Sequence, residues 1–121
     1  MNYIVKKNNN LTMIRGDSFE HHFCLETGRF PRKKKLVIGD DDLIYFGVMY
    51  PNDHFEGCIF KKELTKEDFD SEGNLVVTIN PEDTHWLRPG TYYYEIKLLY
   101  SSSENTYLKT LVQKTKFILI D

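Results

Sequence analysis

Four histidines are the side chains of this sequence best suited to acid–base chemistry or metal binding. His21 and His22 are adjacent, whereas His54 and His85 lie far from them and from each other. Successive side chains of a β-strand point to opposite faces, so two neighbours in a strand cannot bind one metal ion together. His21 falls on the apolar face of its segment, which predicts a hydrogen-bonded histidine in the core.

The two cysteines and the nearby carboxylates do not form a catalytic pattern. Neither Cys24 nor Cys58 has further ligands at the spacing of a zinc site, or the sequence context of a catalytic thiol. Glu63, Glu67 and Asp68 are close in sequence, but carboxylates at such spacing are common in turns. We therefore expect no catalytic residue, no metal ion, no cofactor and no enzymatic activity.

The tripeptide Arg15-Gly16-Asp17 is the recognition sequence of many integrin ligands. Such a site needs an exposed, flexible loop, and here the tripeptide stands between two predicted strands with no spare residues around it. Gly16 can adopt a positive φ, and Asp17 can bond to the backbone beyond a turn. Gly39-Asp40 again precedes a strand, so we predict a turn in both places and no integrin-type receptor as partner.

A basic tract from Arg29 to Lys35 raises the question of nucleic-acid binding. It holds five of the sixteen basic residues, but Asp40, Asp41 and Asp42 follow closely and the net charge of the chain is −2. The positive field that attracts phosphate backbones is therefore missing over the whole chain. We expect a solvated loop and no nucleic-acid partner.

The chain has the size and composition of one globular domain. It has 121 residues, of which 40% are hydrophobic and 28% are charged. Its apolar runs fall far short of a membrane span of about 20 residues, and residues 1–10 lack the apolar region of a signal peptide. We expect synthesis in the cytoplasm, no membrane contact and free thiols. Residues 1–10 are expected to form an additional edge strand or arm.

Short alternating segments separated by turns predict an all-β fold of seven or eight strands with one or two short helical turns. Residues 43–51 are the most hydrophobic run and predict a central strand. Thr65 is a predicted N-cap and Pro81 a predicted first helical residue. The predicted strands are residues 2–7, 11–15, 18–26, 43–51, 58–64, 75–79, 91–100 and 106–120.

The stretch 87–98, LRPGTYYYEIKL, predicts an immunoglobulin-like antiparallel β-sandwich. In such sandwiches a Tyr near the start of a late strand packs over the preceding corner, and its hydroxyl bonds to upstream backbone. Leu87, Gly90 and Tyr92 have the spacing of this structural corner. Alternation places Tyr92 and Tyr94 inside and leaves only Tyr93 exposed, so the three tyrosines are not a stacking platform.

Several motifs occur in an order that resembles a known family. They are Gly16-Asp17, Gly39-Asp40 before Phe46 and Val48, Lys61-Lys62, Glu67-Asp68, the PEDT of 81–84, the stretch 87–96, Thr110-Leu111 and the apolar end 117–120. Together they resemble small immunoglobulin-like structural proteins of tailed phages and prophages, similar in outline to the N-terminal domain of phage baseplate upper proteins. The likeness covers nearly the whole chain after residue 11.

The resemblance implies a structural or assembly protein of a tail, baseplate or head decoration, made in the bacterial cytoplasm and located in the virion. Its partners would be other virion proteins in a symmetric homo- or hetero-oligomer. Strand addition would use the first and last strands, with Tyr3, Ile4, Val5, Phe117 and Ile118 as the partner-binding residues.

The alternative is a β-sandwich module that binds a carbohydrate or a host surface protein through exposed aromatic rings. The candidates for exposed rings are Tyr45, Tyr50, Phe55, Trp86 and Tyr93. Of these, Trp86 beside the turn of residues 81–84 is expected to cap the core instead.

Overall fold

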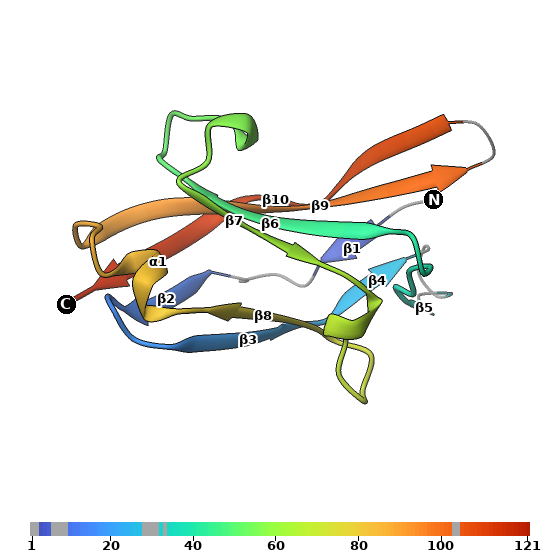
Figure 1. The fold of residues 1–121 in the computed structure, drawn as a ribbon, viewed down its shortest axis with the longest axis horizontal. Helices are drawn as coiled ribbons and strands as arrows, with labels where there is room; N and C mark the ends of the chain where they lie inside the picture. Colours follow the sequence, from blue (N-terminus) through green and yellow to red (C-terminus); the bar gives the residue numbers. More distant parts are fainter. Residues whose placement is uncertain (1–2, 6–9, 28–31, 33, 103–104) are drawn as a thin grey trace.

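The alternating segments of the chain form β-strands in two facing layers (Figure 1). The computed structural model describes residues 3–5, 10–27, 32, 34–102 and 105–121, and these are mostly β, which confirms the predicted class. The strands are β1 (Tyr3–Val5), β2 (Leu11–Ile14), β3 (Phe19–Phe23), β4 (Leu25–Thr27), β5 (Lys34–Lys35), β6 (Leu43–Met49), β7 (Phe60–Leu64), β8 (Leu75–Ile79), β9 (Gly90–Ser102) and β10 (Asn105–Ile120). The helical segments are η1 (Phe55–Gly57), η2 (Lys66–Asp68) and α1 (Pro81–Thr84).

One layer is a five-stranded sheet in the order β2-β10-β9-β6-β7. β6, the most hydrophobic run of the sequence, lies inside this sheet and pairs antiparallel with both β7 and β9. β10 pairs antiparallel with β9, and its last residues, Phe117 to Ile120, also pair parallel with β2. An early strand and the last strand of the chain therefore lie side by side.

The facing layer is built from β8 and strands of the first third of the chain. β3 pairs antiparallel with β8. β4, which follows β3 after Cys24, lies between β1 and the two-residue strand β5. The predicted segment 18–26 thus divides at Cys24, and β5 is additional, which is why more strands form than the seven or eight expected. Both cysteines are free.

Three aromatic rings from three strands meet between the layers. The ring centroids of Phe46 and Tyr94 are 5.2 Å apart, and Phe23 lies 5.7 Å from Tyr94 and 6.3 Å from Phe46. All three side chains are buried, and burial raises the pKa of the Tyr94 hydroxyl. Period two places three residues of β8 in the same core, namely Leu75, Val77 and Ile79.

The corner before β9 contains the bond that the sequence led us to expect. The hydroxyl of Tyr92 donates a hydrogen bond to the carbonyl oxygen of Arg88 at 2.7 Å. Leu87 and Tyr92 are both buried, and Gly90 has a φ of +156° at the point where β9 begins. The chain therefore turns from α1 into β9 through a corner whose tyrosine is anchored to the backbone.

His21 departs from its predicted role. It lies on the same side of β3 as Phe19 and Phe23, as alternation required, but it is only half-buried. Its ring packs against these two rings, with centroid distances of 6.3 Å and 4.5 Å, and it makes no hydrogen bond to the described residues. Burial, followed by the charge of His22, lowers the pKa of His21. Aromatic packing, not hydrogen bonding, holds this imidazole.

Candidate functional site

The β9–β10 hairpin extends beyond the rest of its sheet. β6 begins at Leu43, opposite Leu99, so from Tyr100 onward none of the described strands pairs with β9 on that side. β2 pairs only with Phe117 to Ile120, and among the described residues no strand pairs with the opposite edge of β10 before them. Residues 100–102 and 105–108, named here the arm, therefore project from the body (Figure 1), and no described strand pairs with either of its outer edges.

Three leucines form a row across the outer face of the five-stranded sheet where the arm begins. Leu43 pairs with Leu99, and Leu99 pairs with Leu108, so the three lie on the same face of neighbouring strands. The adjacent Ile44 is fully buried, which directs this leucine row away from the core. Leu108, at the outer edge of the row, is 56% exposed. Outer faces of antiparallel sheets are usually polar, so this row is an exception.

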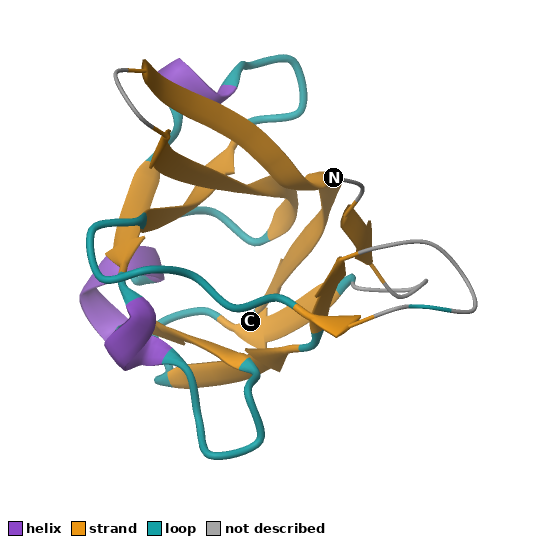
Figure 2. Ribbon diagram, turned by 90° about the vertical axis from the view of Figure 1, so that its right-hand side faces the viewer, coloured by secondary structure: helices purple, strands orange, loops and turns teal. Residues whose placement is uncertain are grey.

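The opposite face of the arm carries a pair of tyrosines. Tyr100 and Tyr107 are directly opposite each other, and their rings stack with centroids 5.3 Å apart. Tyr107 is 42% exposed. A two-stranded hairpin is only marginally stable in water by itself, so the ring stacking supports the arm. Apolar side chains thus lie on both faces of the arm. Figure 2 shows the ribbon from the side on which the arm projects.

The middle of the same outer face is covered by residues of the chain itself. Gly47 on β6 leaves room for the ring of Phe55 from η1, and a Cβ at position 47 would lie 2.8 Å from that ring. The ammonium groups of Lys61 and Lys97 lie 5.8 Å and 5.3 Å from the centroid of the same ring. Lys61 also lies 5.2 Å from the ring of Tyr45. These two aromatic rings are therefore engaged by lysines and do not form an open platform.

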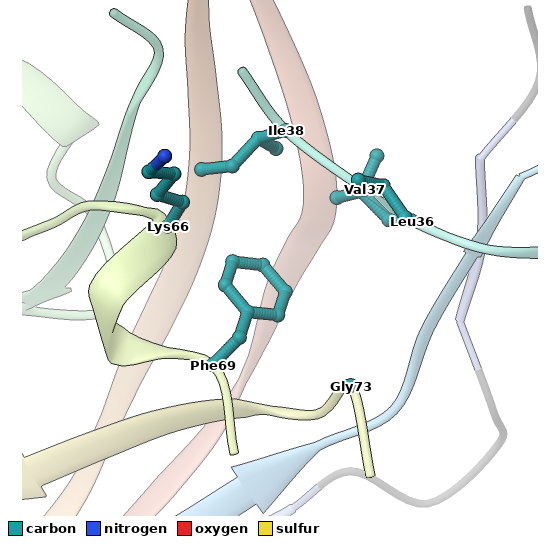
Figure 3. A pocket seen from close by; sticks show the side chains of 6 residues that line it. All are labelled: Leu36, Val37, Ile38, Lys66, Phe69 and Gly73. Atoms are coloured by element: carbon teal, nitrogen blue, oxygen red, sulfur yellow. The ribbon is translucent and has the colours of Figure 1, made fainter. Parts of the chain in front are cut away.

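A small apolar pocket opens near the start of β6 (Figure 3). Its volume is about 260 Å³, and it lies between the segment 36–38 and the residues that follow η2. Val37 at its rim is 88% exposed. Lys66 at the pocket forms an ion pair with Asp40, which lowers the pKa of that carboxyl group. The lining residues are Leu36, Val37, Ile38, Lys66, Phe69 and Gly73.

The tripeptide Arg15-Gly16-Asp17 forms a turn between β2 and β3, which confirms the structural prediction. The amide of Asp17 donates to the carbonyl oxygen of Ile14 at 3.1 Å, and Gly16 has a φ of +82°. The amide of Gly16 donates to the hydroxyl of the buried Thr84 at 2.9 Å. This turn is bound to α1 and is not a free loop.

The guanidinium group of Arg15 is also engaged. It donates to the carbonyl oxygen of His85 at 3.0 Å and forms an ion pair with Asp121 at 3.1 Å. The side chain that an integrin-type receptor would have to contact is therefore occupied by α1 and the end of the chain. No integrin-type partner is proposed.

The terminal strands differ from the strand-addition prediction at one end. Phe117 is fully buried, and Phe117 and Ile118 pair with β2 on one side and β9 on the other. The prediction that they offer an open edge is wrong, because β2 already occupies it. Residues 3–5 form β1, which lies at the edge of its sheet beside β4.

Two other expectations concern Trp86 and the basic tract of residues 29–35. Trp86 is 58% exposed, so it does not cap the core as predicted. Residues 28–31 and 33 of the basic tract lie outside the described residues, and in the rest of it Lys35 bonds to Asn74 at 2.9 Å and to the carbonyl oxygen of Glu72.

Over the residues that the structure describes, no group of three or more His, Cys, Asp or Glu side chains could hold a metal ion. Within the same residues, no helix has the length and apolarity needed to cross a membrane. The leucine row and the arm are features that sequence reasoning missed. Both come from the register between β6, β9 and β10, although the extra length of the last two strands was a visible signal.

Comparison with known proteins adds no family to these observations. A scan against protein-family models found no match, and a search of curated proteins found no significant similarity to this chain.

Proposed function

We propose that this chain is a non-enzymatic assembly protein of a phage or prophage particle that acts through protein–protein contacts. The observation that carries the proposal is the arm, with Leu108 and Tyr107 exposed beside open strand edges. Exposed apolar side chains and unpaired edges are the features through which β-proteins bind neighbours. The placement in a virion rests on the order of sequence motifs described above.

The sheet order supports an immunoglobulin-like topology for this module. In variable-type domains the last two strands and strand C form a sheet that strand C′ extends, while strands B and E pair in the other sheet. β10-β9-β6-β7 corresponds to the first set and β3-β8 to the second. The anchored Tyr92 lies at the start of the strand where the tyrosine corner of such domains occurs.

The aromatic cluster supports the same topology. In antibody domains a disulfide joins strands B and F, and a Trp of strand C packs against it. Here Phe23 of β3 and Tyr94 of β9 contact each other across the layers, and Phe46 of β6 packs against both. Three aromatic rings thus take the place of the disulfide and its tryptophan, as suits a protein with free thiols.

The proposal is tested by quantitative mass spectrometry of density-banded particles from an induced culture of the source organism. We expect the protein to band with particles at a stoichiometric level, and immunogold labelling then places it on the tail or the head. A protein that stays entirely in the lysate overturns the particle assignment. When the Leu108→Ser variant replaces the wild-type protein, we expect less of it to be incorporated into particles. The matched control is Thr106→Ser in the same arm.

A second candidate is a carbohydrate- or host-surface-binding module, which the exposure of Trp86 favours. An exposed indole ring can stack on a sugar face, and this is the only Trp of the chain. Its fluorescence therefore reports directly on binding at that position. A change on adding host envelope sugars, together with hits on a glycan array, supports this function, and an unchanged spectrum with no hits rejects it.

A further inference from the structure

A histidine on the surface of β3 lies between two carboxylates. The Nδ1 atom of His22 is 2.6 Å from an Asp70 carboxylate oxygen, and its Nε2 atom is 2.7 Å from a Glu20 carboxylate oxygen. Glu20 is on the same strand, whereas Asp70 lies 48 residues further along the chain. We name this group of three residues the His22 clamp.

The clamp requires a particular protonation state of the imidazole. An ionised carboxylate only accepts hydrogen bonds, and a neutral imidazole has a single N–H to donate. Both contacts can be hydrogen bonds only if His22 is the imidazolium cation. Bonding to Asp70, and then to Glu20, raises the pKa of His22, and the bond from His22 is the main cause of a lowered pKa at Asp70.

Asp70 also organises the turn that leads into β8. Its other carboxylate oxygen accepts hydrogen bonds from the amides of Glu72 and Asn74, both at 2.9 Å. Its backbone amide and carbonyl bond to Asn74 and Gly73. Bonds within the turn of residues 70–74 hold it together, Leu75 directly after it pairs with Phe23 of β3, and His22 is the side chain of β3 that bonds to Asp70.

Few other charges face the clamp. On β3, His21 points to the opposite face, and its pKa is lowered. β8 places the uncharged Val76 opposite His22. The turn itself contributes Glu72, and Lys35 of β5 bonds to the turn at Asn74 and the Glu72 carbonyl oxygen. The protonation of His22 is thus the titration that directly alters the contact between β3 and the turn.

The turn also forms one wall of the pocket. Gly73 lies in it, and Phe69 immediately precedes it (Figure 3). We propose that the His22 clamp is a pH-dependent latch: protonated His22 holds the 70–74 turn against β3, and loss of the proton loosens the turn and the pocket wall that it carries. This inference does not depend on the proposed function.

The sign of the pH dependence follows from linkage. Because the pKa of His22 is raised in the folded protein, its stabilising contribution is fully present below the unfolded value of about 6.5. The contribution is lost as the pH rises through the folded-state pKa of His22. The latch is therefore closed in mildly acidic solution and released in alkaline solution.

NMR of the imidazole protons in the intact chain tests the first step. We expect His22 to titrate above the ordinary histidine pKa of about 6.5, and Glu20→Gln, which leaves the bonds within the turn in place, to lower that midpoint. A midpoint at or below the ordinary value in the wild-type protein overturns the proposal.

Amide hydrogen exchange tests the release of the turn. The exchange rates of Glu72, Gly73 and Asn74 are compared between His22→Gln and wild type at the same pH, so that intrinsic rates cancel. We expect the variant to exchange about two- to fivefold faster below the His22 midpoint and at the wild-type rate well above it. His54→Gln, a change at an exposed loop residue, is the matched control. A ratio that is the same at every pH contradicts the latch.

Discussion

The two ends of this molecule differ in how far their polar groups and strand edges are paired, although each has an exposed apolar side chain, Trp86 at one and Leu108 at the other. At one end, named here the fastened end, the turn of residues 15–17 is bonded to α1 and to Asp121, and the hydroxyl of Tyr92 is bonded to Arg88. At the other end no described strand pairs with the outer edges of the arm, and Leu108 and Tyr107 are exposed. Hydrogen-bonded polar groups and buried side chains stabilise the fold. Exposed apolar side chains and unpaired strand edges remain available for a partner.

The comparison predicts that substitutions at the fastened end lower stability and that substitutions in the arm lower binding. The residues substituted at the fastened end are buried or hydrogen-bonded, whereas the residue substituted in the arm is exposed. Four substitutions examine this separation, beginning with the core beneath the fastened end.

Phe117→Ala is expected to have the largest effect. This side chain is fully buried, and its ring lies 6.4 Å from that of Phe60. Truncation of a buried Phe costs about 3–5 kcal/mol of unfolding free energy because it removes apolar burial and leaves a cavity. Urea denaturation measures the loss, and exposed Lys116→Ala on the adjacent position is the control. A loss below about 1 kcal/mol would show that this region is not packed as described.

Thr84→Val should follow. The hydroxyl of this buried residue accepts the hydrogen bond from the Gly16 amide. Valine has the same shape but no acceptor, so the amide loses its partner at a cost of about 1–3 kcal/mol. Thermal and urea denaturation measure this change. Thr84→Ser keeps the hydroxyl, and a Ser variant as unstable as the Val variant would argue against the bond as the cause.

Tyr92→Phe is expected to cost about 0.5–1.5 kcal/mol, because it removes one hydrogen bond and leaves the ring in place. The bond at risk is the one from the hydroxyl to the Arg88 carbonyl oxygen. Tyr93→Phe, at the partly exposed neighbouring position, is the control for loss of a hydroxyl. Equal effects of the two variants in urea denaturation would remove the corner as a special source of stability.

Leu108→Ser is expected to change the unfolding free energy by less than about 0.5 kcal/mol, since this side chain is largely exposed. Its effect should appear instead in incorporation into particles, as described above. Denaturation of the purified variant measures the change in unfolding free energy. A destabilisation as large as that of Thr84→Val would place Leu108 in the core of the fold and remove the contrast between the two ends.

Local patterns in the sequence predicted much of the architecture. The strand predicted at 75–79 forms β8, and the hydrophobic run at 43–51 predicted the internal strand β6. Thr65 is the N-cap that the sequence predicted, and Asp68 completes a reciprocal cap with it. Such features depend on residues a few positions apart, so the chain carries their signal locally.

The candidate site was less visible in the sequence. The leucine row exists because Leu43, Leu99 and Leu108 meet through the register of three strands. Trp86 was expected inside and lies outside, and Phe117 was expected at an edge and lies in the core. Each error concerns which distant segment covers a residue, and period two does not specify that.

Local sequence patterns specified most of the strands, the corner before β9 and the turn of residues 15–17, because steric and hydrogen-bonding preferences act over a few residues. The pairing of β2 with the end of β10, the lack of a described strand paired beside the arm, and the contact of His22 with Asp70 depend instead on the tertiary structure. The strand pairings depend on the register that buries the most apolar surface across the whole core, and the contact of His22 with Asp70 follows from the pairing of β3 with β8.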